Sequence, residues 1–100
     1  MIALKSPLFK PGRILGTPGA IEALEQSGQS VWELLTRHLA GDWGVVDAHD
    51  KAANDEALKD GSRLLSAYLL KTNVTIWVVT EAEDDNGNRA ATTALLPENY

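Results

Sequence analysis

Hydrophobic positions follow the period of β-strands most clearly in the last third of the chain. Arg63–Lys71 is a long apolar run in which both alternate sets are apolar, as is typical of a central strand buried on two sides. Thr75–Glu81 is rich in β-branched and aromatic residues, and Ala90–Leu96 forms a third strand that Pro97 ends. The short connections between these runs predict an antiparallel meander, with Glu83–Asn88 as an exposed loop.

A short strand and a first helix are predicted near the start of the chain. Gly12–Gly16 has the composition of a short edge strand. Thr17 precedes Pro18, which is the pattern of an N-cap followed by proline at the first helical position, where its missing N–H is no loss. Ile21 and Leu24 then supply the apolar side of this helix.

Two further helices are predicted before the strands begin. Ser30 and Glu33 have the spacing of a capping box, in which each side chain accepts a backbone N–H. An apolar arc follows at 100° per residue: Val31, Leu34, Leu35, His38 and Leu39. The third helix runs from its cap Asp47 to about Lys59 and carries a stripe of alternating charge: Asp47, Lys51, Asp55 and Lys59.

The predicted order is one strand, three helices and three strands, and helices followed by strands indicate the α+β class. We therefore expect a single domain over residues 1–100. Two or three helices should pack on one face of a three- to four-stranded antiparallel sheet with a C-terminal β-meander. The first strand of the meander, Leu64–Leu70, should lie at the centre of the core.

Composition removes several classes of function. The absence of cysteine excludes disulfides, zinc–thiolate sites and cysteine nucleophiles, and it fits a reducing compartment. A net charge of −5 argues against nucleic-acid binding, since phosphate contacts need clustered Lys and Arg. No run approaches the ~18 apolar residues of a membrane span, and Met1–Leu8 lacks the features of a signal peptide. A cytoplasmic protein without a membrane segment is expected.

The sequence motifs predict neither a cofactor nor a metal site. The Gly-x-Ser-x-Gly nucleophile pattern is absent, and the glycines between positions 12 and 19 lack the Lys-Ser/Thr of a P-loop. The loop around Gly87 has the composition of a calcium loop, but the required glutamate six positions later is Thr93. His38 is interpreted as a boundary histidine with one ring nitrogen satisfied. His49 is interpreted as a surface residue, because no third and fourth ligands are evident.

Surfaces for a protein partner are the remaining candidates. Asp42 and Trp43 lie in a glycine-flanked loop, where a tryptophan is either an exposed interface anchor or a plug that closes the core. The plug is favoured, and Trp32 and Trp77 are predicted to be core residues. Acidic side chains also gather on the third helix and in the loop before Asn88. The predicted partner-binding residues are Asp42, Trp43, Asp47, Asp50, Asp84 and Asp85.

Several segments resemble a family of small bacterial proteins that are found on plasmids and integrated elements and are labelled plasmid-related. These segments are Gly12–Leu24, Arg37–Gly44, the Asp50-Lys51…Asn54 spacing, Arg63–Tyr68 and Ile76–Ala82. The resemblance extends from Gly12 to Tyr100 and departs between Ala82 and Thr92, where this chain has a longer and more acidic loop. The family carries no activity to transfer, but a mobile-element setting favours toxin, antitoxin or anti-defence roles.

The predicted topology is also similar to that of the RelE/ParE toxin superfamily, ribosome-dependent ribonucleases that bind and cleave mRNA with basic and aromatic residues of the sheet. This resemblance implies the catalytic candidates Arg63, Tyr68, Arg89 and Tyr100. Nine basic residues against fourteen acidic ones weaken an RNA-cleaving function. The sequence therefore favours a small non-enzymatic protein that occludes a partner protein, with the toxin as the alternative. A homodimer through a sheet edge, Arg13–Gly16 or Ala90–Leu96, is a third hypothesis.

Overall fold

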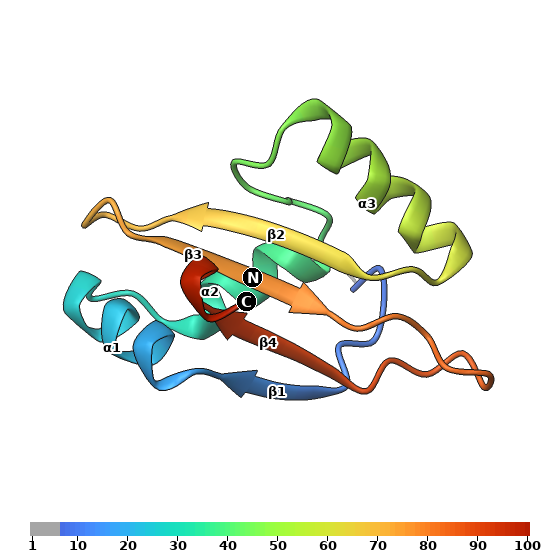
Figure 1. Ribbon diagram of the computed structural model, residues 1–100, viewed down its shortest axis with the longest axis horizontal. Coiled ribbons are helices and arrows are strands. Elements are labelled where there is room, and N and C mark those ends of the chain that lie inside the picture. Colours follow the sequence, from blue (N-terminus) through green and yellow to red (C-terminus); the bar gives the residue numbers. More distant parts are fainter. Residues whose placement is uncertain (1–6) are drawn as a thin grey trace, which may run out of the picture.

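The computed structural model describes residues 7–100, so most of Met1–Leu8, the segment considered for a signal peptide, lies outside the described residues. The elements in chain order are β1 (Arg13–Gly16), α1 (Pro18–Ser27), α2 (Val31–Leu39), α3 (Ala48–Asp60), β2 (Leu64–Leu69), β3 (Thr75–Thr80), β4 (Ala91–Leu95) and the short 3-10 helix η1 (Pro97–Asn99). The α+β class and the meander β2–β3–β4 are confirmed (Figure 1).

The four strands form one mixed sheet in the order β1-β4-β3-β2. The prediction of a wholly antiparallel sheet was wrong, because β1 pairs with β4 in parallel. The strands β2 and β4 run in the same direction, because both are antiparallel to β3. The long connection through three helices lets the chain return to the sheet so that β1 also runs in this direction.

Two predictions about strand position were also wrong. The strand within Arg63–Lys71 lies at an edge of the sheet rather than at its centre, and the strand within Ala90–Leu96 is internal rather than at an edge. Residues of β2 are apolar on both faces although β2 is an edge strand. The reason is that α3 and the segment around Trp43 pack beside it. The edge position predicted for Gly12–Gly16 is confirmed.

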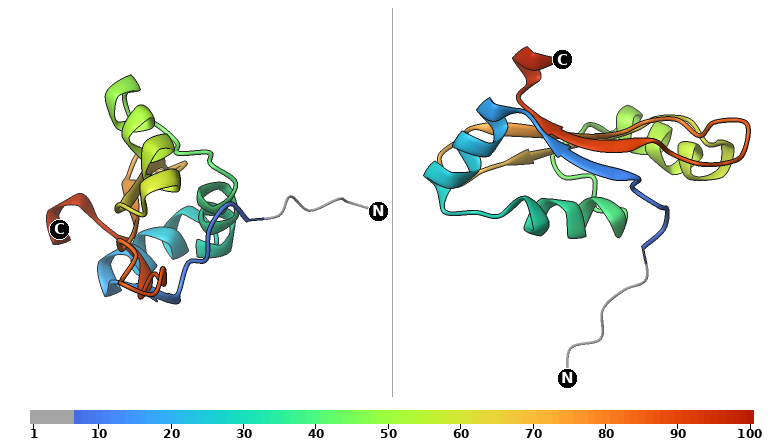
Figure 2. Two further views of the ribbon diagram at one scale, coloured as in Figure 1. Left: turned by 90° about the vertical axis from the view of Figure 1, so that its right-hand side faces the viewer. Right: turned by 90° about the horizontal axis from the view of Figure 1, so that it is seen from below.

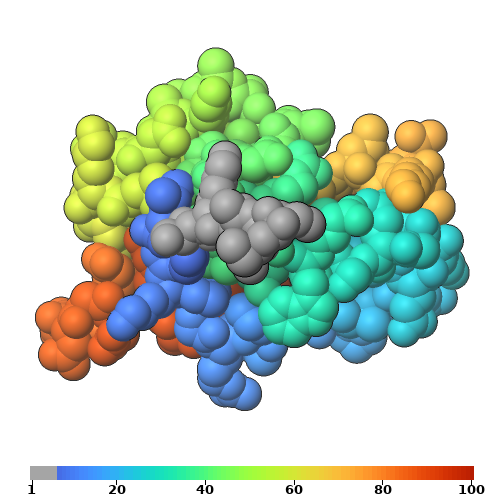
Figure 3. Space-filling model, turned by 180° about the vertical axis from the view of Figure 1, so that it is seen from behind, coloured from blue at the N-terminus to red at the C-terminus, as the bar shows by residue number. Residues whose placement is uncertain are grey.

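The helices are placed unequally around the sheet. The helices α1 and α2 cover one face, η1 lies on the opposite face, and α3 runs beside the edge strand β2 (Figure 2). Seen from behind, α1 and α2 lie in front of the sheet (Figure 3). The main core lies between these two helices and the sheet: Ala20, Ala23, Leu24, Leu34, Tyr68, Leu70, Ile76, Val78 and Ala94. None of the helices within residues 7–100 has the length and apolarity to cross a membrane.

The helix starts follow the predicted caps with one exception. Thr17 caps α1 by accepting the N–H of Ala20, and Asp47 caps α3 by accepting the N–H of Asp50. Ser30 caps α2, but it accepts the N–H of Trp32 at 3.1 Å. The predicted capping box is therefore not formed.

The carboxylate that was expected to complete this box has another partner. Glu33 accepts from the side chain of Gln29 at 2.7 Å instead of reaching back to Ser30. The prediction that Trp32 is a core residue was also wrong, since 61% of this residue is exposed. Its position lies outside the apolar arc of α2, which directs Leu34 and His38 into the core.

Candidate functional site

The sheet face opposite α1 and α2 is covered by no helix except η1 (Figures 1 and 2). The strand register places Leu65, Val79, Thr93 and Leu15 in one row across this face, from β2 to β1. The next row contains Ala67, Trp77 and Leu95. We call this surface the open face. It is mostly apolar, and a groove of about 450 Å³ lies along it between Leu15 and Tyr100.

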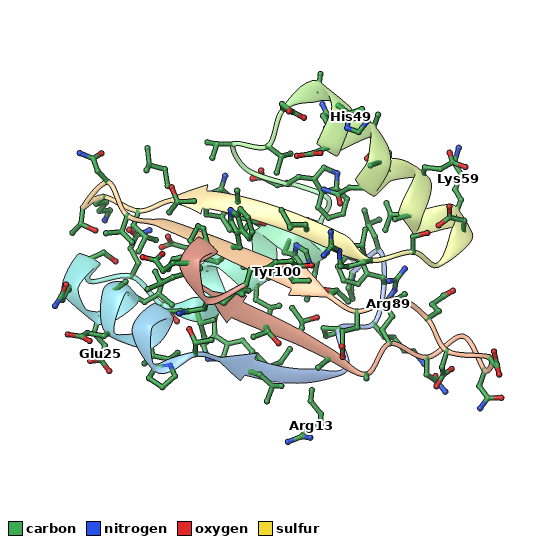
Figure 4. All side chains as sticks on the ribbon, in the orientation of Figure 1. Arg13, Glu25, His49, Lys59, Arg89 and Tyr100 are labelled. Atoms are coloured by element: carbon green, nitrogen blue, oxygen red, sulfur yellow. The ribbon has the colours of Figure 1, made fainter. Side chains whose placement is uncertain are left out.

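An aromatic cluster of Arg63, Trp77 and Tyr100 stands on the open face. The rings of Trp77 and Tyr100 meet edge to face, with centroids 5.6 Å apart and an interplanar angle of 71°. The guanidinium carbon of Arg63 lies 5.2 Å from the centroid of the Tyr100 ring, within the range of a cation–π contact. Tyr100 remains 61% exposed and lies in front of the middle of the sheet (Figure 4).

The turn into η1 fixes the position of Tyr100. Pro97 begins η1, and Asn99 accepts the N–H of Leu96 at 3.2 Å. The hydroxyl of Thr17 donates to the same Asn99 oxygen at 3.0 Å, while it accepts the N–H of Ala20 to cap α1. The start of α1 therefore anchors the segment that carries the exposed ring.

Arg63 has a cationic head that pairs with no carboxylate of the described residues. The ion pairs found within residues 7–100 are Arg37–Asp42 and His49–Asp50, and neither involves Arg63. Since its guanidinium contacts an aromatic ring through its face, the N–H groups remain available to a carboxylate from outside the chain.

The helix-covered face holds a buried chain of polar side chains. His38 Nδ1 lies 2.5 Å from Ser66 Oγ, and His38 Nε2 lies 2.8 Å from Thr80 Oγ1. Thr80 Oγ1 lies 2.7 Å from Thr92 Oγ1, which donates to the carbonyl of Pro11 at 2.8 Å. We call this series the buried histidine chain.

The Pro11 carbonyl fixes the direction of the hydrogen bonds between His38 Nε2 and Thr92. Because Thr92 donates to Pro11, it accepts from Thr80, and Thr80 in turn accepts from His38 Nε2–H. At neutral pH the imidazole is neutral, so Nδ1 accepts from the Ser66 hydroxyl. Burial, with a smaller contribution from the charge of Arg89, lowers the pKa of His38 to about 4.

This arrangement corrects the interpretation of His38 as a boundary residue with one satisfied nitrogen. His38 is fully buried, both ring nitrogens are bonded, and the rings of Phe9 and Trp43 pack against it. Ser66 is also fully buried. The Ser66–His38 pair has the spacing of a nucleophile and its base, but both side chains are fully buried, and their hydrogen bond links α2 to β2 within the core.

The four toxin-like residues do not converge on one surface. Arg63 and Tyr100 meet on the open face. Tyr68 is buried on the other face, where its hydroxyl donates to the Asp42 carbonyl at 2.6 Å, and burial raises its pKa. Arg89 is 7% exposed and sits beyond the strands at the end of α3 (Figure 4).

Arg89 is held by backbone carbonyls. Its guanidinium donates to Ser62 at 2.8 Å, to Glu81 at 2.9 Å and to Ala57 at 3.2 Å. Ala57 lies in the last turn of α3, where a cation also complements the helix dipole. The side chain therefore joins α3 to the strand ends.

The loop residues predicted to bind a partner are largely occupied within the chain. Asp42 pairs with Arg37 at 2.7 Å, which lowers the pKa of the Asp42 carboxyl. Trp43 is 3% exposed and donates to Asp55 at 3.1 Å. The interpretation of Trp43 as a plug is confirmed, so its ring does not present a contact surface.

The other predicted partner-binding residues lie in two separate places. Asp47 and Asp50 are exposed at the start of α3. Asp84 and Asp85 lie in the β3–β4 loop, where Asp84 accepts the N–H groups of Asn86 and Asn88. The structure thus does not gather the predicted set into one surface.

His49 is exposed, as predicted, and it lies close to two carboxylates. Ligand atoms of Asp47, His49 and Asp50 are within 4.8 Å of one another, a proximity that no metal-ligand spacing in the sequence indicated. Asp47 is already engaged as the helix cap through one carboxylate oxygen. Along the rest of the charged stripe of α3, no ion pair is found within the described residues, and Asp55 instead accepts from Trp43.

Comparisons of the chain with protein-family models, with curated proteins and with solved structures gave no match.

Proposed function

We propose that this chain is a small non-enzymatic interaction protein that binds a partner protein on its open face and occludes the partner's surface. The observation that carries this proposal is the aromatic cluster of Arg63, Trp77 and Tyr100 on a sheet face that no long helix covers. Tryptophan, tyrosine and arginine are the residue types that contribute most to binding at protein interfaces.

The cluster specifies the chemistry of the partner. The exposed side chains of Leu15, Leu69 and Tyr100 fit an apolar centre, and the groove beside Tyr100 accepts a protruding side chain. Arg63, which pairs with no carboxylate of residues 7–100, calls for an acidic side chain at the rim. We therefore expect a partner surface with an apolar centre and an acidic rim. The resemblance to plasmid-borne proteins supports an inhibitor or anti-defence factor.

The ribonuclease alternative has weaker support. It draws on Arg63 and Tyr100, which are adjacent on the open face, but Tyr68 and Arg89 are held inside the chain by hydrogen bonds to backbone carbonyls. An RNA-cleaving site needs its basic and aromatic groups on one accessible surface.

The test compares substitutions on the two faces. The partner is first identified by co-purification from the native host and mass spectrometry, and its purified form is then titrated calorimetrically. Tyr100→Ala and Arg63→Ala should each weaken binding about tenfold or more, because each removes part of the cluster. Trp32→Ala is the matched control, since it removes an equally exposed aromatic from the opposite side and should leave the affinity unchanged.

Two results would overturn the proposal. One is a partner whose affinity is the same for the wild-type chain and for Tyr100→Ala. The other is turnover of RNA or of a small substrate by the purified protein alone.

A further inference from the structure

We propose that two copies of this chain pair through β1, in antiparallel register centred on Leu15, so that their sheets become continuous. This proposal concerns the free edge of the sheet and does not rest on the partner-binding function of the open face.

The outer edge of β1 has unpaired backbone groups. The N–H groups of Arg13 and Thr17 donate to Ala90 and Ala94, so these residues point toward β4. Because backbone direction alternates along a strand, the N–H and C=O groups of Ile14 and Gly16 point to the other side. No partner for them is found within residues 7–100.

The opposite edge of the sheet is closed by side chains and a loop. Asn54 accepts the N–H of Leu65 at 3.0 Å and donates to its carbonyl at 2.7 Å. Ala67 donates to the Trp43 carbonyl at 3.1 Å and accepts from Val45 at 2.7 Å. The fold thus satisfies the outward groups of β2 at these positions and leaves those of β1 open, which makes β1 the edge available for strand addition.

Apolar side chains flank the free edge on both faces. Leu15 is 40% exposed on the open face, and Ile21 is 38% exposed on the helix-covered face. A Cβ at Gly16 would lie 2.8 Å from Ile21 Cδ1, so the Ile21 side chain covers the site that Gly16 leaves empty. Arg13 is the only charged residue of the strand, and it points away from the sheet at its end (Figure 4).

A second copy fits this edge because the pattern of β1 is symmetric about Leu15. In the antiparallel register, Ile14 of one copy faces Gly16 of the other, and these residues exchange N–H···O=C bonds in both directions. Leu15 meets Leu15 of the second copy at the non-hydrogen-bonded position, where side chains approach most closely. Ile14 of the second copy lies beside Gly16 and therefore packs on Ile21.

The same symmetry keeps like charges and the two α1 helices apart. The two Arg13 side chains lie at opposite ends of the paired strands, each facing Thr17 of the other copy, so like charges are not juxtaposed. Since α1 begins directly after Thr17, the two α1 helices also lie at opposite ends of the pair. The strand is short, so we expect a reversible dimer whose population rises with protein concentration.

The test is the mass in solution, measured by sedimentation equilibrium over a range of concentrations. The wild-type mass should rise from 10.8 kDa toward twice that value. Leu15→Lys and Leu15→Glu should each stay monomeric, because like charges would face each other across the symmetry axis. An equimolar mixture of the two variants should recover the dimer, which separates a broken interface from a misfolded chain.

Leu69→Lys is the matched control. Leu69 is a more exposed leucine on the same sheet face at the closed edge, and its substitution should leave the dimer intact. Added salt should strengthen the dimer because each copy carries a net charge of −5, whereas it should weaken partner binding through Arg63. A monomeric wild-type protein at every concentration, or unchanged dimerisation of Leu15→Lys, would overturn the proposal without affecting the proposed function.

Discussion

His38 Nε2 donates to Thr80 Oγ1 at 2.8 Å inside the core, and this contact ties α2 to β3 through a side chain that ionises in the acidic range. The imidazole is neutral at pH 7, because burial and the charge of Arg89 lower its pKa to about 4. Protonation would reverse the hydrogen bond to Ser66 and place an unpaired charge in the core, where buried Arg89 repels it. The fold should therefore be sensitive to acid.

The free energy of unfolding should fall as the pH drops from about 6.5 to about 4. The folded-state pKa of His38 is lowered to about 4 from 6.5, so the unfolded state binds the proton more tightly in this window. Above pH ~6.5 the ionisation of His38 does not lower the free energy of unfolding. Below the folded-state pKa the decrease in the free energy of unfolding reaches a plateau of about 3 kcal/mol. The lowered pKa of Asp42 acts in a more acidic window, below its ordinary value of 3.8. Urea unfolding at several pH values measures this dependence.

Substitutions separate the two histidines. His49→Gln should change stability at neutral pH by less than about 0.5 kcal/mol, because His49 is exposed at the start of α3. His38→Gln should lower stability at neutral pH and flatten its pH dependence, since the titrating group is gone. An unchanged slope in His38→Gln would contradict the assignment of this pH dependence to His38.

Arg89→Ala should lower the free energy of unfolding by about 3 kcal/mol or more, because it leaves several buried carbonyls without their donor. Arg89→Lys should recover only part of this loss, since an ammonium cannot reproduce the planar fork. Arg13→Ala, at an exposed arginine, should change stability by less than about 0.5 kcal/mol. Chemical denaturation gives all three values, and equal stability of Arg89→Ala and Arg13→Ala would contradict a structural role for Arg89.

This prediction affects how a toxin test is interpreted. Growth arrest that is relieved by Arg89→Ala would follow from unfolding as readily as from loss of catalysis. Arg63→Ala is the informative variant for the ribonuclease alternative, because Arg63 contacts an exposed ring and is outside the core.

Local patterns predicted the elements well, because caps and alternation are encoded by neighbouring residues. Two helix starts were identified from their capping residues, Thr17 and Asp47, and one strand from the β-branched run around Trp77. Strand order was not encoded locally. An apolar run such as Leu64–Leu70 is compatible with a central strand or with an edge strand that a helix covers. Here β2 is an edge strand, and α3 is the helix that packs beside it.

The candidate site was missed for a related reason. Alternation placed Trp77 and Val79 on one face of their strand, but it did not indicate which face the helices would cover. Arg63 and Tyr100 were selected through a resemblance, and their contact with Trp77 depends on η1 folding back over the sheet. The buried histidine chain could have been predicted from polar residues in the strands, because polar side chains on a buried face need hydrogen-bond partners. These residues are Ser66, Thr80 and Thr92.

The two tryptophans of the helical region should respond oppositely to truncation. Trp43→Ala should lower the free energy of unfolding by about 3–5 kcal/mol, because it empties a site packed against Phe9, His38 and Leu64. Trp32→Ala should change it by less than about 0.5 kcal/mol. Thermal denaturation ranks the two variants, and acrylamide quenching should lose its most accessible component in Trp32→Ala alone. A stable Trp43→Ala would show that the loop does not close the core.

Asn54 closes the edge of the sheet at β2. Asn54 satisfies both backbone groups of Leu65, and its own side chain is buried. Asn54→Asp keeps an acceptor for the Leu65 N–H but removes the donor to its carbonyl, so the carboxylate faces a carbonyl oxygen. We expect the free energy of unfolding, measured with urea at neutral pH, to fall by about 2 kcal/mol or more, with partial recovery in acid as the carboxyl protonates and donates again.

Asn88→Asp, in the exposed loop, is the control and should show neither effect. Because His38 acts in the opposite direction with pH, each variant is compared with the wild type at the same pH. A pH-independent difference between Asn54→Asp and the wild type would contradict the proposed hydrogen-bond geometry at Leu65.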